Sequence, residues 1–173
     1  MAYVAFFRNV NQGQRGQPST DDLLSAFADA GCTGAASFQS NGTIVFTDAS
    51  PERVLSRVQA AMTESTGTER EVFGMPLSKI ASLVDDHSLA EDAARRELTL
   101  HRGGSIDVDD PSVVGAAAHR RCRMIAAGEG WTIASNERDR ESNATPVVEL
   151  LTGGPATSRG LPTLIRLVDR FAR

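Results

Sequence analysis

The chain has 173 residues, of which 40% are hydrophobic and 23% charged, as is typical of a soluble globular protein with one compact domain or two small ones. Its net charge of -4 argues against broad electrostatic binding of nucleic acid, which needs a basic surface. No apolar run approaches the roughly 18 residues of a membrane span, so we expect no membrane partner and a cytoplasmic location. Cys32 and Cys122 fit no metal-ligand spacing and predict buried free thiols.

The first half of the chain predicts a ferredoxin-like unit, in the order strand, helix, strand, strand, helix, strand. Its first strand is apolar on both faces, as in a central strand, and a Gly-rich polar loop over 9–18 follows it. Asn41-Gly42 between two apolar runs is a strong hairpin signal, and Pro51 opens the second helix. The segments, in chain order, are 3–8, 20–30, 35–39, 43–47, 51–63 and 69–75.

The second half repeats this pattern in a degenerate form, after a connecting helix over 76–84. Its predicted strands are 97–101, 121–127 and 131–135, and its predicted helices are 110–118, about 145–152 and 160–172. The fold class is therefore α+β, with one ferredoxin-like unit, a second degenerate one and a C-terminal helix. We expect domains over 1–84 and 97–173, joined by a linker over 85–96.

Three segments resemble motifs of a known bacterial family. The opening YVAFFRNVNQG, residues 3–13, is similar to YVALLRGINVGG in the proteins called domain of unknown function 1697. Residues 39–46, QSNGTIVF, resemble that family's QSGNVVF, and residues 156–163, ATSRGLPT, resemble its ATTRNWNTV. The resemblance covers essentially the whole chain and implies a cytosolic α+β protein with two ferredoxin-like units. It implies no activity.

The chain departs from each of these motifs. The family's Ser-Gly-Asn is Ser40-Asn41-Gly42 here, which displaces the Asn side chain by one position. The segment that follows Arg159 has lost two Asn and a Trp, and Arg-Gly-Ile-Asn has become Arg8-Asn9-Val10-Asn11. The chain is thus identified as a divergent member with a remodelled polar site.

Polar residues at the ends of elements suggest a composite ligand site. In a ferredoxin-like sheet the first and third strands are adjacent and antiparallel, so the end of the first strand lies near the hairpin turn. The last helix begins after a loop rich in Gly and hydroxyl groups, which suits an anion. The predicted ligand-binding residues are Arg8, Asn11, Gln39, Ser40, Asn41, Thr157, Ser158 and Arg159.

Other chemistry finds less support. The loop over 9–18 lacks both phosphate-loop motifs, and Asp21 and Asp22 would repel a phosphate at the start of the next helix. The three histidines show no metal-ligand spacing, and no Ser lies in a nucleophile elbow, so we predict no metal, no cofactor and no nameable catalytic residue.

The leading hypothesis is a protein that binds a small anionic ligand, as a monomer or homodimer. One alternative is a nucleic-acid-binding protein that uses the segment from His119 to Arg123, near Trp131, although the aromatic motif of RNA-binding sheets is missing. A second alternative is an enzyme of unknown reaction.

Overall fold

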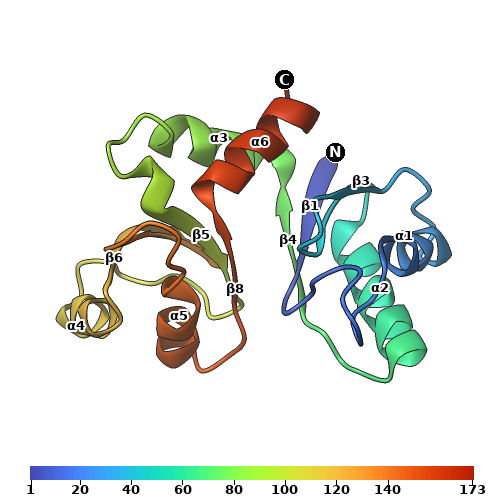
Figure 1. Cartoon of the computed structure of the whole chain (residues 1–173), viewed down its shortest axis with the longest axis horizontal. Coiled ribbons are helices and arrows are strands. Elements are labelled where there is room, and N and C mark those ends of the chain that lie inside the picture. The colour runs from blue at the N-terminus through green and yellow to red at the C-terminus, as the bar shows by residue number, and fades with distance from the viewer. The chain divides into compact units, whose positions relative to one another are not determined.

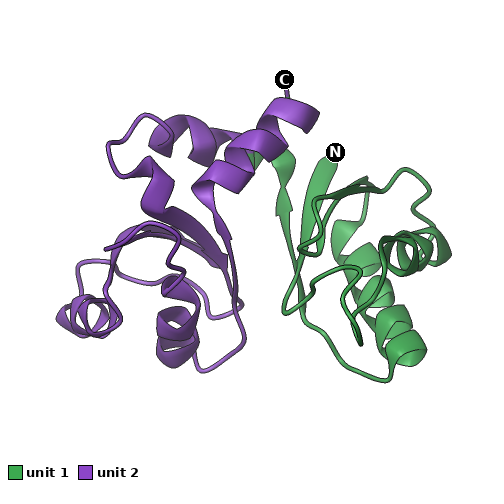
Figure 2. Ribbon diagram, viewed as in Figure 1, with its two compact units in different colours: residues 1–80, 172 green, residues 81–171, 173 purple.

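The computed structural model describes residues 1–173 and divides them into two compact units (Figure 2). Unit 1 comprises residues 1–80 with Ala172, and unit 2 comprises residues 81–171 with Arg173. Each unit contains a four-stranded antiparallel sheet and accompanying helices (Figure 1). The predicted α+β class with two ferredoxin-like units and a C-terminal helix is confirmed.

Unit 1 is built around the central strand β1. Its elements are β1 (Ala2–Phe7), α1 (Thr20–Asp29), β2 (Ala36–Phe38), β3 (Thr43–Thr47), α2 (Pro51–Thr66) and β4 (Val72–Pro76). The strand order is β2-β3-β1-β4, so β1 pairs on one side with β3 and on the other with β4. This pairing satisfies the backbone hydrogen bonds along both edges of β1. The last four residues of the strand are all buried, in agreement with its apolar character on both faces.

The helices of unit 1 begin where the sequence signals place them. Ser19 caps α1: its hydroxyl accepts from the Asp22 backbone N–H, and the Asp22 carboxylate accepts from the Ser19 backbone N–H. Pro51 occupies the start of α2, and Gly67 ends that helix in a left-handed conformation.

One face of this sheet packs against both helices. Ala5 and Phe7 of β1 join a buried cluster with residues of α1 and α2. Phe27 of α1 lies edge-on to Phe7, with ring centroids 6.5 Å apart, and 5.1 Å from the ring of Phe46. These contacts fix the end of β1, and therefore the position of Arg8 directly after it.

The hairpin turn differs in detail from the prediction. Gln39 was expected in the second strand, but β2 ends at Phe38 and the turn spans 39–42. Positive φ angles fall at Gln39 and Gly42 rather than at Asn41, so this is not the two-residue Asn-Gly turn. The Asn41 side chain instead accepts a hydrogen bond from the Thr43 hydroxyl at 2.7 Å.

Unit 2 repeats the same topology. After α3 (Leu77–His87), in which the unit boundary falls, its elements are η1 (Ala93–Arg95), β5 (Arg96–Leu100), α4 (Pro111–His119), β6 (Cys122–Gly128), β7 (Trp131–Asn136), α5 (Ala144–Thr152), β8 (Thr157–Gly160) and α6 (Leu161–Phe171). The strand order is β6-β7-β5-β8, which places β5 where β1 stands in unit 1.

Strand β8 corrects the prediction of a loop before the last helix. Thr157–Gly160 pairs antiparallel with β5, with Ser158 opposite Thr99 and Arg159 opposite Leu98. Apart from Thr157, this run carries little strand propensity, so its pairing with β5 decides its structure.

Residues 85–96, expected as a linker, contain the end of α3, η1 and the first residue of β5, and all of them belong to unit 2. Arg96 forms an ion pair with Asp92 at 2.7 Å and a hydrogen bond with His87 Nδ1 at 2.7 Å.

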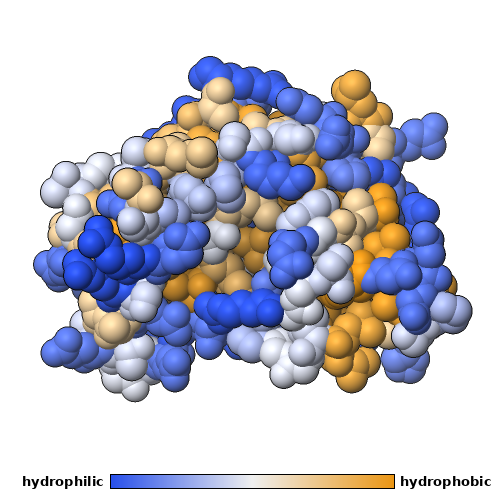
Figure 3. Space-filling view, turned by 180° about the vertical axis from the view of Figure 1, so that it is seen from behind, coloured by the Kyte–Doolittle hydropathy of each residue, from blue (hydrophilic) through white to orange (hydrophobic).

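Large exposed hydrophobic residues in unit 2 include Leu89, Val114 and Leu150. Figure 3 shows one face of the molecule, where hydrophobic residues form separate patches among hydrophilic ones.

A buried carboxylate organises unit 2. Glu97 of β5 is 2% exposed and accepts hydrogen bonds from the backbone N–H groups of Asn143 and Ala144, at 3.0 and 2.9 Å. It also accepts from the Asn136 amide and the Ser142 hydroxyl. Asn143 makes no side-chain cap bond of its own, so Glu97 caps α5 from a distant strand.

Replacing Gly42 by Ala is expected to destabilise the protein by about 2–4 kcal/mol, because a Cβ there would lie 2.9 Å from the Cβ atoms of Phe7 and Val10 at a φ of +69°. Gly13→Ala is the control: φ is +80° but nothing lies within 4 Å, so we expect about 1 kcal/mol. Chemical denaturation measures both. Equal losses at the two positions would show that close packing at Gly42 is unimportant.

Glu97→Ala is expected to reduce the free energy of unfolding by about 3–5 kcal/mol, because several buried donors lose their acceptor. Glu91→Ala, at an exposed acid of the same unit, is the control and is expected to change stability by less than about 0.5 kcal/mol. A loss below about 1 kcal/mol for Glu97→Ala would contradict a capping role.

Candidate anion-binding site

The end of β1 and the hairpin turn lie side by side in unit 1. The Phe7 backbone N–H donates to the Gly42 carbonyl at 2.8 Å, and the Gln12 N–H donates to the Ser40 carbonyl at 2.8 Å. The sequence placed these two segments together through the adjacency of the first and third strands. The structure therefore brings the loop that follows Arg8 onto the turn that contains Asn41.

Gln12, which the sequence did not single out, joins this loop to its surroundings. Its side chain is buried and its Nε2 donates to the hydroxyls of Thr20 and Ser37, both at 3.0 Å. Its Oε1 accepts from the Gly42 N–H at 3.4 Å. All of these partners belong to the fold, so Gln12 positions the loop.

A pocket of about 380 Å³ lies on the other side of the β1 end. The Arg8 backbone N–H donates to the Glu71 carbonyl at 2.9 Å, which sets the end of β1 beside the residues that precede β4. The lining residues are Arg8, Asn9, Gln17, Thr68, Glu69, Arg70 and Glu71. Every one is polar, so the pocket suits a small polar molecule rather than an apolar one.

Arg70 is the unusual member of this pocket. Its side chain is 9% exposed, yet its hydrogen-bond partners are neutral: the Thr66 hydroxyl at 3.1 Å and the Gly16 carbonyl at 3.5 Å. It forms no ion pair with a carboxylate. A buried charge is costly unless it is paired, and no protein carboxylate forms an ion pair with this cation of the cavity wall.

The Arg70 guanidinium has N–H groups that donate to no protein acceptor. A guanidinium has five N–H groups, and the two protein bonds use one on Nη1 and one on Nη2. Nε–H and one N–H on each terminal nitrogen are left, in the planar arrangement that matches a carboxylate or a phosphate. Glu69 and Glu71 line the same pocket and add negative charge and acceptor oxygens.

Of the residues predicted from sequence, only Arg8 lines this pocket. Asn11 is exposed, and its backbone N–H donates to Gln17 Oε1 at 3.4 Å. Gln39 and Ser40 are exposed in the turn, and the Asn41 amide oxygen is engaged by Thr43. The hairpin residues hold the turn in shape.

The remaining predicted residues lie in unit 2, on β8. The Ser158 hydroxyl bonds those of Thr99 and Thr145 at 2.7 and 2.6 Å. Arg159 Nη1 donates to the Thr157 hydroxyl at 3.1 Å and the Ser158 carbonyl at 2.8 Å, and burial lowers the pKa of Arg159 to about 10. This group is described within unit 2, and its grouping with Arg8 stays a prediction.

The histidines form no metal centre, and no group of three metal-binding side chains is found. His101 is buried; its Nδ1 accepts from the Gly103 N–H at 3.2 Å, and its Nε2 has no partner. Burial lowers the pKa of His101, against smaller opposing effects of the Trp131 backbone and Glu129. The imidazole is therefore a neutral part of the interior at neutral pH.

The basic segment after α4 lies beside acidic residues from other parts of unit 2. Arg121 forms an ion pair with Glu141 at 3.3 Å, and the Glu137 N–H donates to the Arg121 carbonyl at 3.0 Å. Nearby carboxylates weaken the attraction of this segment for a phosphate backbone. No helix combines the length and apolar character that a membrane crossing requires.

Comparison with known proteins assigns the family. The sequence model described as "Protein of unknown function (DUF1697)" matches residues 1–114, and the chain belongs to this family. No curated protein matches the chain.

One solved structure supports the fold. The conserved bacterial protein SP0830 from Streptococcus pneumoniae has a similar fold, with a TM-score of 0.65, 16% identity and coverage of 97% of both chains. The small subunit of acetolactate synthase from Thermotoga maritima reaches a TM-score of only 0.25, at 13% identity over 92% of both chains, which does not indicate a shared fold.

The low pKa of His101 predicts a loss of stability in acid. The unfolded chain takes up a proton near pH 6.5, whereas folded His101 does so only at lower pH, so the free energy of unfolding falls as pH drops below about 6.5. His101→Gln is expected to make this fall shallower, with His119→Gln, at an exposed site, as the control for the substitution. Denaturation between pH 5 and 8 measures it; identical slopes for wild type and His101→Gln would refute the account.

Proposed function

We propose that this member of the DUF1697 family binds a small anionic ligand in the unit 1 pocket, with Arg70 as its principal contact. The observation that carries the proposal is the buried guanidinium of Arg70, which lines the pocket without a carboxylate partner. A ligand carboxylate would form the ion pair with Arg70 that no protein carboxylate makes. Arg8, on the same lining, adds a second cation.

The acidic residues of the pocket restrict the kind of anion. Glu69 and Glu71 would repel a dianion such as phosphate, but their oxygens accept hydrogen bonds from ligand hydroxyl groups. Gln17 and Thr68 add further polar groups to the wall. The ligand class that fits is a small hydroxylated monocarboxylate, and we propose glycerate as the probe.

A cytoplasmic location is part of the same proposal. Cys32 and Cys122 are both buried and unpaired, and free thiols are typical of proteins in a reducing compartment.

Calorimetric titration with glycerate, acetate, inorganic phosphate and glycerol tests the binding site. We expect glycerate to bind more tightly than acetate and phosphate, and glycerol not to bind, because only glycerate combines one negative charge with hydroxyl donors. Arg70→Met is expected to weaken glycerate binding by about 10- to 100-fold, the value of one charge-assisted contact.

The control for this substitution is Arg57→Met, at an exposed arginine on α2. Arg70 has no carboxylate partner, so Arg70→Met leaves no unpaired charge behind and should remain folded, which circular dichroism checks. Arg8→Gln is a second variant and is expected to weaken binding less. Wild-type affinity in Arg70→Met, or no glycerate binding at millimolar concentrations, would disprove the proposal.

A further inference from the structure

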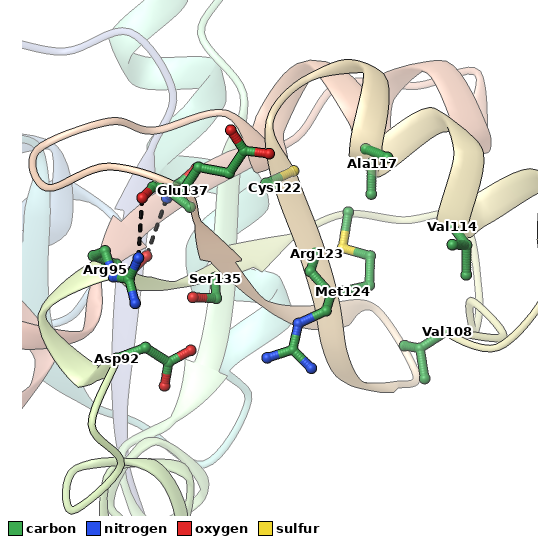
Figure 4. Close-up of a pocket in the computed structure, with 12 residues that line it drawn as sticks. Asp92, Arg95, Val108, Val114, Ala117, Cys122, Arg123, Met124, Ser135 and Glu137 are labelled. Atoms are coloured by element: carbon green, nitrogen blue, oxygen red, sulfur yellow. Dashed lines mark hydrogen bonds between the residues drawn. The ribbon is translucent and has the colours of Figure 1, made fainter.

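Unit 2 contains a second pocket, of about 410 Å³, between α4 and the β6–β7 side of its sheet (Figure 4). This volume lies within the range of small-molecule sites. All of its lining residues belong to unit 2, and none is among the residues predicted to bind a small ligand. Two of them, Cys122 and Arg123, lie in the segment considered above for nucleic acid. Its chemistry differs from that of the unit 1 pocket because one half of the wall is apolar.

The apolar half is formed by Val108, Val114, Ala117 and Met124. Figure 4 shows the first three on one side of the pocket, across from Asp92, Arg95 and Glu137. Val114 is 52% exposed, which is high for a valine and leaves apolar surface open at the pocket. A ligand with a hydrocarbon or aromatic body would cover this surface and gain the free energy of its burial.

The carboxylate of Asp92, on the polar half, already has a counter-charge. Asp92 pairs with Arg96 at 2.7 Å. Although burial acts in the opposite direction, hydrogen bonds with Ser135 and Arg96 lower the pKa of Asp92, so its carboxylate is ionised and neutralised by Arg96 at neutral pH. This pair therefore adds no net charge to the pocket.

Among the other charged groups that line the unit 2 pocket, arginines outnumber carboxylates. Arg95 donates through Nη1 to the backbone carbonyl of Glu137 at 3.0 Å, a neutral acceptor, and the Arg123 guanidinium forms no hydrogen bond or ion pair. These two cations exceed the single carboxylate of Glu137. Burial raises the pKa of Cys122 to about 11, so the thiol on this wall adds no negative charge.

We propose that the unit 2 pocket binds an amphipathic monocarboxylate, with its carboxylate on Arg123 and Arg95 and its apolar body on Val108, Val114 and Met124. The carboxylate matches the planar guanidinium donors, and the body covers the exposed apolar side of the pocket. This site is independent of the pocket around Arg70, with which it shares no residue.

The test uses 3-phenylpropionate as the probe, with 3-phenylpropionamide and acetate as matched compounds lacking the charge or the apolar body. Calorimetry gives the dissociation constants, and ¹⁵N–¹H NMR shifts locate the binding. We expect both matched compounds to bind at least tenfold more weakly than the acid. The largest shifts should fall on backbone groups of α4, β6 and the end of β7.

Arg123→Gln is expected to weaken binding of the acid about tenfold, and Arg120→Gln, at an exposed arginine that does not line the pocket, should change it less than twofold. Val114→Trp, which fills the open side, should weaken binding of acid and amide alike. Arg70→Met should leave it unchanged, which separates this site from the proposed function. Equal affinity of acid and amide, wild-type binding by Arg123→Gln, or no binding at 10 mM would overturn the proposal.

Discussion

The central position of β1 is the constraint on which unit 1 depends. Because β1 pairs with both β3 and β4, its last residues must lie beside the hairpin turn on one side and the residues before β4 on the other. The first pairing is so close at Gly42 that a side chain would meet Phe7 and Val10. The second sets Arg8 beside Glu71 and forms the pocket in which Arg70 lies.

The buried charges of Glu97 in unit 2 and Arg70 in unit 1 differ in their hydrogen-bond partners. Glu97 in unit 2 is buried, and side-chain and backbone donors of its own unit satisfy it, so it is a complete structural element. Arg70 in unit 1 is nearly as well buried but has only a hydroxyl and a carbonyl as partners. A buried charge whose hydrogen bonds are all made within the protein stabilises the fold. A buried charge without a carboxylate partner, on the wall of a pocket, indicates that a ligand binds there.

The sequence predicted correctly those elements that are determined by residues close together in the chain. The Ser19 cap, the Pro51 helix start and the hairpin at Asn41-Gly42 are set by neighbouring residues, and the structure contains all three elements. The family resemblance, drawn from three short motifs, is confirmed by the match over residues 1–114. Strand β8 was missed because its four residues become a strand only through pairing with β5.

The same distinction separates the two arginines of the unit 1 pocket. Arg8 could be selected because it ends an apolar strand, which is a local pattern. Arg70 could not be selected from the sequence. Its side chain bonds to the loop at Gly16 and to the end of α2 at Thr66, two segments that only the fold brings together. Between Glu69 and Glu71 in the sequence, it resembles an ordinary surface residue.

The most direct measurement is NMR observation of the Arg70 Nε–H signal, assigned by its loss in Arg70→Met, as glycerate is added. Nε–H is a donor that the protein leaves unused, so we expect a saturable shift of this signal that follows the binding curve, and no shift with glycerol. An Arg70 signal that stays in place while other groups of the protein titrate with glycerate would show that Arg70 does not contact the ligand.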